Sequence, residues 1–275
     1  MSDDPSLRDR VVLITGGTRG LGREIALGLV EGGARVMITA RRHGPEMEEA
    51  LALLRALGGP DCAQGSAADV RNSADCNRVV AETIASFGAV HVLFNNAGLG
   101  LQSIADHHGR SRSKFWETDD APWTALVDTN VNGVFYMARA VAPMMIGQGF
   151  GKIINVSTNR HTMLRLGGSS YGGAKAFLEL ASRVWAKDLE GTSVTVNVFL
   201  PGGPVDTGIR TEALPPGFKF HPIGMMRAPA RWLSSDLSNG HTSERYVARL
   251  WDENLPLPER IVCARESGID LPQIM

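Results

Sequence analysis

Short apolar runs rich in β-branched residues alternate along the chain with longer stretches whose apolar residues recur every three to four positions. The short runs predict strands of a parallel sheet buried on both faces, and the longer stretches predict the helices that cover it. Strands are expected at 11–16, 35–40, 61–67, 90–98, 151–158 and 193–202, and helices at 21–29, 47–57, 73–87, 121–147 and 170–190. This order predicts an α/β fold with a doubly wound, Rossmann-like parallel sheet.

The regular alternation ends near Thr207. The segment at about 207–227 mixes proline, glycine and aromatic residues such as Phe218 and Phe220, as substrate loops do. A further helix is expected near 227–237. The stretch at about 250–275 has no strong periodicity, so we expect an irregular extension that wraps the surface or joins a subunit interface. All 275 residues are expected to form a single domain.

Composition narrows the kinds of partner. The chain has 28 Lys and Arg against 29 Asp and Glu, so its net charge of −1 gives no reason to expect nucleic acid or an anionic membrane. Cys62, Cys76 and Cys263 are widely spaced, which favours neither a disulfide framework nor a zinc site. No apolar stretch reaches the ~20 residues that span a bilayer. We therefore expect a soluble, cytoplasmic protein that binds a small molecule.

A glycine-rich turn, ITGGTRGLGREIALGL, joins the first strand to the first helix. Glycine permits positive φ and a close approach of the backbone, and a helix N-terminus presents free N–H groups to an anion. Gly16, Gly20 and Gly22 therefore predict a pyrophosphate site. Their spacing is not the common GxGxxG, so a plain tight turn is the alternative reading.

The end of the second strand bears on the choice of cofactor. An NAD site usually has an acidic residue roughly twenty residues after the glycine turn, to hold the ribose 2'-hydroxyl. Ala40 stands at that place, and Arg41 and Arg42 follow it. Guanidinium groups bind a 2'-phosphate, and Arg19 in the glycine turn is a third candidate, so NADP(H) is expected. The alternative is that Arg41 and Arg42 are a solvated helix start.

The stretch YGGAK places Tyr171 and Lys175 one helical turn apart on the same face. A nearby ammonium lowers the pKa of a phenol, and a serine N-cap in SSY would add the helix dipole in the same direction. Tyr171 is thereby a candidate proton donor or acceptor for a carbonyl or an alcohol. The alternative is a surface tyrosine packed beside a lysine stem.

At this point the chain resembles the short-chain dehydrogenase/reductase family over about residues 8–208. The resemblance is carried by five motifs in order: TGGTRGLG, NNAG after the fourth strand, TNVNGVF, YGGAK, and PGGPVDT after the sixth strand. The terminal VDGG frequent in the family is absent, which puts the usual C-terminal packing and tetramer contacts in doubt.

The resemblance implies a four-residue catalytic site. Tyr171 would act as acid and base, Lys175 would lower its pKa and hold the nicotinamide ribose, and Asn130 would support a proton path. The family's serine usually lies thirteen residues before the tyrosine, where this chain has Thr158 with Ser157 adjacent. Successive strand residues point to opposite faces, so only one hydroxyl can serve. We assign Thr158 and keep Ser157 as the alternative.

The resemblance also implies the cofactor groove. Gly172 and Gly173 would keep the space between phenol, ammonium and cofactor clear. The residues expected to bind NADP(H) are Gly16, Thr18, Arg19, Gly20, Leu21, Gly22, Arg41, Arg42, Asp69, Val70, Asn95, Asn96, Ala97, Gly98, Tyr171, Lys175, Pro201, Gly202, Val205 and Thr207.

These expectations combine into an NADP(H)-dependent oxidoreductase that moves hydride between nicotinamide and a carbonyl or secondary alcohol carbon. One alternative is a nucleotide-binding regulatory protein that kept the fold and lost turnover, and another is an isomerase or dehydratase. His107, His108 and His161 have no ligand-spaced partners, so no metal is expected. By resemblance, the helices at 121–147 and 170–190 would pair across a two-fold axis in a homodimer or homotetramer.

Overall fold

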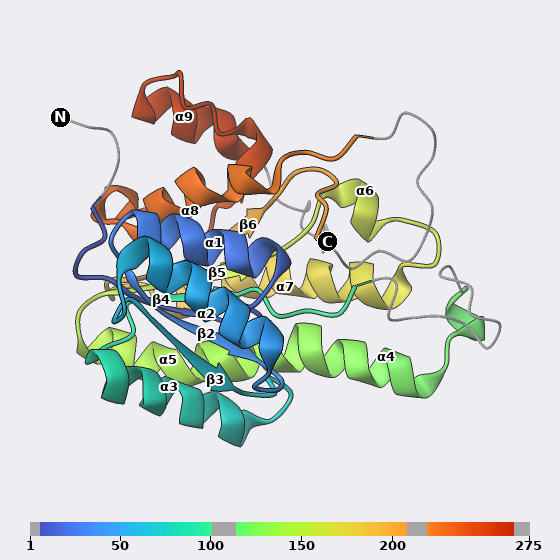
Figure 1. The fold of residues 1–275 in the computed structure, drawn as a ribbon. Coiled ribbons are helices and arrows are strands. Elements are labelled where there is room, and N and C mark those ends of the chain that lie inside the picture. The colour runs from blue at the N-terminus through green and yellow to red at the C-terminus, as the bar shows by residue number, and fades with distance from the viewer. Residues whose placement is uncertain (1–5, 101–113, 208–218, 267–275) are drawn as a thin grey trace.

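One eight-stranded sheet runs through the protein, in the order β3-β2-β1-β4-β5-β6-β7-β8 (Figure 1). The structure is a computed structural model that describes residues 6–100, 114–207 and 219–266. β1 to β7 pair in parallel, and β8 is antiparallel to β7. The strands are β1 (Val11–Ile14), β2 (Arg35–Ala40), β3 (Ala63–Ala67), β4 (Val92–Asn95), β5 (Gly151–Val156), β6 (Val194–Leu200), β7 (Arg245–Val247) and β8 (Arg265–Glu266). The predicted doubly wound sheet is confirmed, and its strand order reverses between β1 and β4, where such sheets bind ligands.

Helices cover both faces of the sheet (Figure 1). They are α1 (Gly20–Glu31), α2 (Pro45–Gly58), α3 (Ser73–Phe87), α4 (Asp120–Val127), α5 (Gly133–Gly147), α6 (Arg160–Met163), α7 (Ser169–Asp188), α8 (Arg227–Ser234) and α9 (Leu257–Ala264). One apolar core joins the sheet to α1, α2 and α8, with Leu29, Leu54 and Trp232 fully buried. The other joins it to α3, α5 and α7, around Val79 and Val141. The strands are apolar on both faces because each face carries a core.

The predicted helix at 121–147 is three pieces in the structure. α4 and α5 are joined by a π-helical turn over Asp128–Asn132, and Asn130 in this turn is only 1% exposed. A π-turn adds a residue to one helical turn and is frequent at functional sites. The extra residue changes the direction in which Asn130 points. Apolar periodicity does not reveal such an insertion, because the residues on either side keep their helical spacing.

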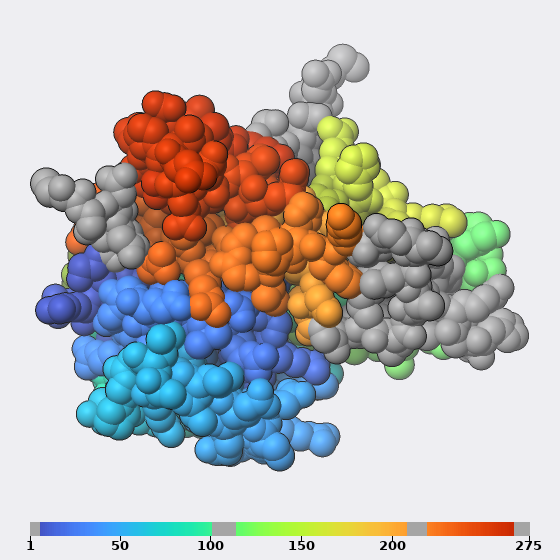
Figure 2. Space-filling model, turned by 45° about the horizontal axis from the view of Figure 1, so that its top comes forward, coloured from blue at the N-terminus to red at the C-terminus, as the bar shows by residue number. Residues whose placement is uncertain are grey.

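The C-terminal part of the chain is more ordered than its sequence pattern predicts. The helix expected near 227–237 is α8, whereas β7, α9 and β8 were not expected. β7 was missed because Glu244 and Arg245 interrupt its apolar run. In Figure 2 the C-terminal segments (orange and red) lie beside the N-terminal elements (blue), and α8 packs directly on α1. Among the described residues, no helix combines the length and the apolar character that a membrane span requires.

Candidate active site

The glycine turn after β1 is shaped by two positive φ angles and one close backbone contact. Gly16 has φ +65° and Gly20 has φ +55°, a region that other residues rarely adopt. A Cβ on Gly22 would lie 2.2 Å from the carbonyl oxygen of Gly16, so only glycine fits there. Arg19, the N-cap of α1, makes no side-chain cap, and the first turn has no acidic residue. The backbone N–H groups of this turn thus fit an anionic pyrophosphate.

Thr15 joins the glycine turn to the end of β4. Its hydroxyl accepts hydrogen bonds from the backbone N–H groups of Asn96 and Ala97, each at 3.0 Å, and donates to the carbonyl of Phe94. The Asn96 amide in turn donates to the carbonyls of Thr15 and Gly16 at 2.9 Å. Thr15 was absent from the predicted site, although it is the first threonine of the TGGTRGLG motif.

Asn95 does not line the groove as expected. It is 3% exposed, and its Nδ2 donates to Oδ1 of Asn155 at 2.9 Å. Asn155 donates in turn to the hydroxyl of Ser182 on α7. Successive side chains along a strand point to opposite faces of the sheet. Asn95 therefore points toward the face covered by α7, whereas the Asn96 side chain binds the glycine turn.

The end of β2 carries no carboxylate at Ala40, and Arg41 and Arg42 are both exposed. The Arg71 guanidinium binds Asp69 bidentately and lowers the pKa of that carboxyl, with a smaller contribution from the Arg41 charge. The charges of Arg71 and Arg41 thus both act on Asp69, near the expected adenosine end of the groove.

The other predicted cofactor residues differ in their exposure and contacts. Arg19 lies 3.5 Å from the carboxylate of Glu46, with both side chains more than half exposed. Thr18 is buried, and Leu21 packs on the apolar core beside α1. Val70 is 7% exposed, and its side chain leaves no room for a Cβ on Gly133.

The segment after β6 closes on the glycine turn. Gly202 has φ +85°, and Val205 forms an isolated bridge with His221. A Cβ on Gly20 would lie 3.3 Å from that of Thr207, so these two motifs, far apart in sequence, are in contact. The carbonyl of Pro201 accepts a hydrogen bond from the N–H of Arg249. Most of the predicted substrate loop, residues 208–218 with Phe218, lies outside the described residues.

Tyr171 and Lys175 lie side by side on α7, as the spacing predicted. Lys175 Nζ is 5.9 Å from the centroid of the Tyr171 ring and donates to the carbonyl of Val156 at 2.7 Å. Burial lowers the pKa of Lys175 to about 8, opposed by the charge of Glu179. Burial raises the pKa of Tyr171, opposed by a hydrogen bond with the Thr158 side chain. The expected lowering of the phenol pKa is wrong, because desolvation by burial exceeds every other influence on the phenol.

The two candidate hydroxyls after β5 have different neighbours. The Thr158 side chain is within hydrogen-bonding reach of the Tyr171 phenol. Ser157 is 4% exposed, and its hydroxyl donates to Glu179 Oε1 at 2.8 Å, on the other side of the strand. The geometry brings Thr158, not Ser157, to the tyrosine.

Asn130 holds the chain that follows NNAG. Its Oδ1 accepts from the N–H of Leu99 at 2.8 Å, and its Nδ2 donates to the carbonyl of the same residue at 2.9 Å. Gly98 lies directly against it, since a Cβ there would be 3.3 Å from Oδ1. The π-turn thus aims Asn130 at the strand end that borders the groove.

Two expectations about the start of α7 are wrong. The N-cap is Gly168, without a side-chain hydrogen bond, and the serines of SSY lie inside the helix. Gly172 does not clear space for a cofactor: a Cβ there would lie 1.9 Å from the carbonyl oxygen of Met163 in α6. Gly173 faces open space, with nothing within 4 Å of such a Cβ. The contact with the Met163 backbone requires glycine at position 172, whereas packing does not require glycine at position 173.

The histidines give no sign of a metal centre in the described ranges. His161 is exposed on α6, and His107 and His108 lie outside the described residues. Among residues 6–100, 114–207 and 219–266, no three acidic, histidine or cysteine side chains gather in a way that could hold a metal ion.

Comparisons with known proteins agree with this architecture. Residues 10–215 match a family model described as short chain dehydrogenase. An NADP-dependent 3-hydroxy acid dehydrogenase of Salmonella typhi is 38% identical over 192 residues, covering 70% of this chain and 71% of that protein. A 3-oxoacyl-acyl-carrier-protein reductase of Synechocystis is 31% identical over 197 residues, covering 72% and 75%. The structure of a short-chain type dehydrogenase/reductase from Mycobacterium ulcerans has a TM-score of 0.76 at 26% identity, covering 87% of this chain and 88% of that one.

The fold and these matches define the class of protein, an oxidoreductase with a Rossmann-like sheet. The chain belongs to the short-chain dehydrogenase/reductase family, and the resemblance carried by the sequence motifs is confirmed.

Proposed function

We propose that the protein is an NADP(H)-dependent oxidoreductase that interconverts a carbonyl and a secondary alcohol, with Tyr171 as the proton donor and acceptor. The observation that carries this proposal is that Tyr171, Lys175 and Thr158 lie together. Tyr171 also packs with Leu99, the residue that Asn130 holds. A nicotinamide bound along this groove would supply the hydride. The glycine turn, Asn96 and the segment at 201–207 would hold it.

The roles of the side chains follow from their surroundings. Tyr171 has a raised pKa and is protonated at neutral pH, which suits donation of a proton to a carbonyl oxygen. The Thr158 hydroxyl, within reach of the phenol, would orient that oxygen. Lys175, with a pKa of about 8, supplies an ammonium that stabilises the phenolate left after the transfer. Asn130 would fix the backbone of Leu99 at the border of the groove.

The substrate proposed first is an acyl compound with a keto or hydroxyl group at carbon 3. The relative from Salmonella typhi is named for 3-hydroxy acids and that from Synechocystis for a 3-oxoacyl group, so both names place the reacting oxygen at carbon 3 of an acyl chain. Purified protein with NADPH and a panel of 3-oxo acids, 3-oxoacyl thioesters and simple ketones tests the activity. NADPH binding without oxidation across the whole panel would favour a silent regulatory protein. Product formed without a change in cofactor absorbance would favour an isomerase or a dehydratase.

Preference for NADPH over NADH should depend on Arg41. The exposed guanidinium at the end of β2, with no acid at Ala40, favours a 2'-phosphate. We expect Arg41→Ala to weaken NADPH binding about tenfold to a hundredfold while leaving NADH binding within twofold, since one charge-assisted contact contributes about 1.5–3 kcal/mol. Fluorescence titration of both cofactors measures the ratio. Arg55→Ala is the control, because the Arg55 guanidinium on α2 is bound to the carbonyl of Ala63. Equal affinities of the wild type for the two cofactors would refute the assignment of NADP(H).

We also propose that the protein forms a homodimer through α5 and α7. Large apolar side chains remain exposed on both helices, and those on α7 recur at helical spacing: Phe177, Leu180 and Val184 are 42%, 45% and 48% exposed. A stripe of this kind is typical of a helix face that packs against a partner.

A further inference from the structure

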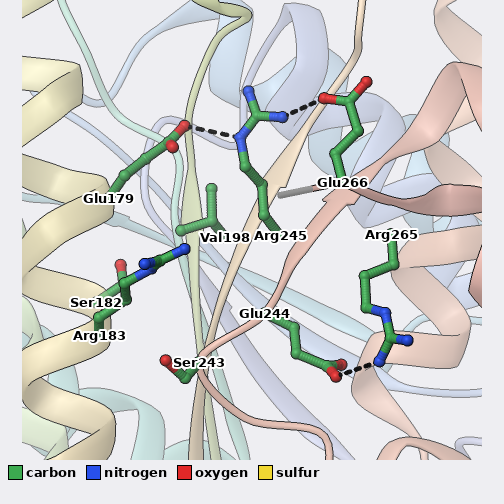
Figure 3. Close-up of a pocket in the computed structure, with 9 residues that line it drawn as sticks. All are labelled: Glu179, Ser182, Arg183, Val198, Ser243, Glu244, Arg245, Arg265 and Glu266. Carbon is green, nitrogen blue, oxygen red and sulfur yellow. Dashed lines mark hydrogen bonds and ion pairs between the residues drawn. The ribbon is translucent and has the colours of Figure 1, made fainter. Parts of the chain in front are cut away.

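Arg245, on β7, lies behind the candidate catalytic residues and connects three parts of the chain. It is 7% exposed. Its Nε binds Glu179 Oε1 on α7 at 3.1 Å, its Nη2 donates to the carbonyl of Thr158 at 3.1 Å, and its Nη1 binds the carboxylate of Glu266 on β8. Figure 3 shows the guanidinium between Glu179 and Glu266. Only arginine offers a planar fork of donors that can reach three acceptors at once.

The end of β5 is tied to charged side chains at three consecutive residues. The carbonyl of Val156 accepts from Lys175, the hydroxyl of Ser157 donates to Glu179, and the carbonyl of Thr158 accepts from Arg245. The third of these residues presents its side chain to Tyr171. The backbone that carries the Thr158 hydroxyl is therefore held from α7 and from β7.

Glu179 links this cluster to Lys175. It is 4% exposed and stands one helical turn after Lys175, where its charge raises the pKa of the lysine against the effect of burial. Its Oε2 is buried without a hydrogen-bond partner in the described part of the chain. A buried carboxylate stays ionised only when it is paired. Arg245 is its cationic partner and holds in place the carboxylate that lies one turn from Lys175.

On the basis of the proposed function, we propose that Arg245 and Glu179 are positioning residues of the active site: they fix the Thr158 backbone beneath Tyr171 and keep a carboxylate beside Lys175. Neither residue belongs to the motifs that mark the family, and Arg245 lies beyond residues 10–215, which match the family model. The C-terminal strands thus act on the site through one buried ion pair.

Two substitutions of Arg245 test the positioning of Thr158. Arg245→Lys keeps a counter-charge for Glu179 but cannot reach the other acceptors, whereas Arg245→Met removes every donor. With the best substrate of the carbonyl panel, we expect kcat to fall about tenfold to a hundredfold in both, with the Kd for NADPH within twofold, because small displacements of a reacting group cost this much. Arg265→Met is the matched control, since Arg265 on β8 pairs with Glu244, the residue before β7, and its side chain is half exposed. An unchanged kcat in Arg245→Lys and in folded Arg245→Met overturns the proposal.

Glu179→Gln tests the charge beside Lys175. The amide keeps an acceptor for Ser157 and the size of the side chain but loses the negative charge. The charged or titratable groups facing Lys175 are Tyr171 and Glu179 on α7, with Arg245 behind Glu179. Without the carboxylate the ammonium gives up its proton at lower pH, so the alkaline limb of the kcat profile should move down by about one pH unit. A uniform loss of kcat at every pH contradicts this role, because a merely structural defect does not move the limb.

Crystal structures separate this proposal from the proposed function. If the wild-type protein reduces no compound of the panel, the proposed function fails, but the positioning role is still decided by the structures of the wild type and Arg245→Lys. The Thr158 hydroxyl should move away from the Tyr171 phenol in the variant. If it stays in place, Arg245 does not position it.

Discussion

Replacing Tyr171 by phenylalanine is expected to lower kcat about a thousandfold, within the range that a general acid contributes. The ring packs in a small apolar cluster with Leu126 and Ala174, and phenylalanine keeps that packing. Only the hydroxyl beside Thr158 is lost, so the fold and the affinity for NADPH should be retained. Steady-state kinetics with the best carbonyl substrate, together with NADPH titration, measures both quantities.

The control for this variant is Tyr136→Phe. Tyr136 is a partly buried tyrosine of α5 that packs on the apolar core below the sheet, away from Lys175. Loss of the Tyr136 hydroxyl should leave kcat within twofold of the wild-type value. A Tyr171→Phe enzyme that keeps more than about a tenth of the parent kcat is incompatible with the phenol as the proton donor.

The adjacent glycines of YGGAK should respond to alanine in opposite directions. Gly172→Ala places a Cβ 1.9 Å from the Met163 carbonyl oxygen, which forces α6 away from α7. We expect a loss of about 2 kcal/mol or more in the free energy of unfolding, the magnitude typical of overpacking. Activity should fall as well, because α6 begins two residues after Thr158.

Gly173→Ala is the matched comparison, since the new Cβ meets open space. Replacing a glycine inside a helix with alanine stabilises it by about 0.5–1 kcal/mol. Urea unfolding of both variants measures the difference. Equal stabilities for the two alanine variants would mean that α6 does not contact α7 as described.

The parts of the fold that follow from apolar patterning were predictable. Parallel strands buried on both faces leave long apolar runs, and their carboxyl ends meet at one edge of the sheet. The glycine turn, NNAG and YGGAK each follow a predicted strand, so they lie at a common edge of the sheet. The three-residue strand β7 begins at Arg245, directly after Glu244, and leaves no such run.

The details that were missed depend on contacts between distant segments. Arg245 binds Glu179 across 66 positions of the sequence and the Thr158 carbonyl across 87, and no local pattern encodes either bond. The requirement for Gly172 comes from the Met163 carbonyl, which belongs to another helix. The lowered phenol pKa was predicted from a neighbouring ammonium and the helix dipole, but burial, which a sequence does not show, has the largest influence and raises that pKa.

The bonds around Thr15 have a consequence for how a dinucleotide would be received. β1 and β4 belong to different halves of the doubly wound sheet, and one hydroxyl together with the Asn96 amide fastens their ends to each other. These bonds connect the two halves of the sheet at the place where they meet. We therefore expect the base of the proposed cofactor groove to move little when a dinucleotide binds, and the segments at its sides to adjust instead.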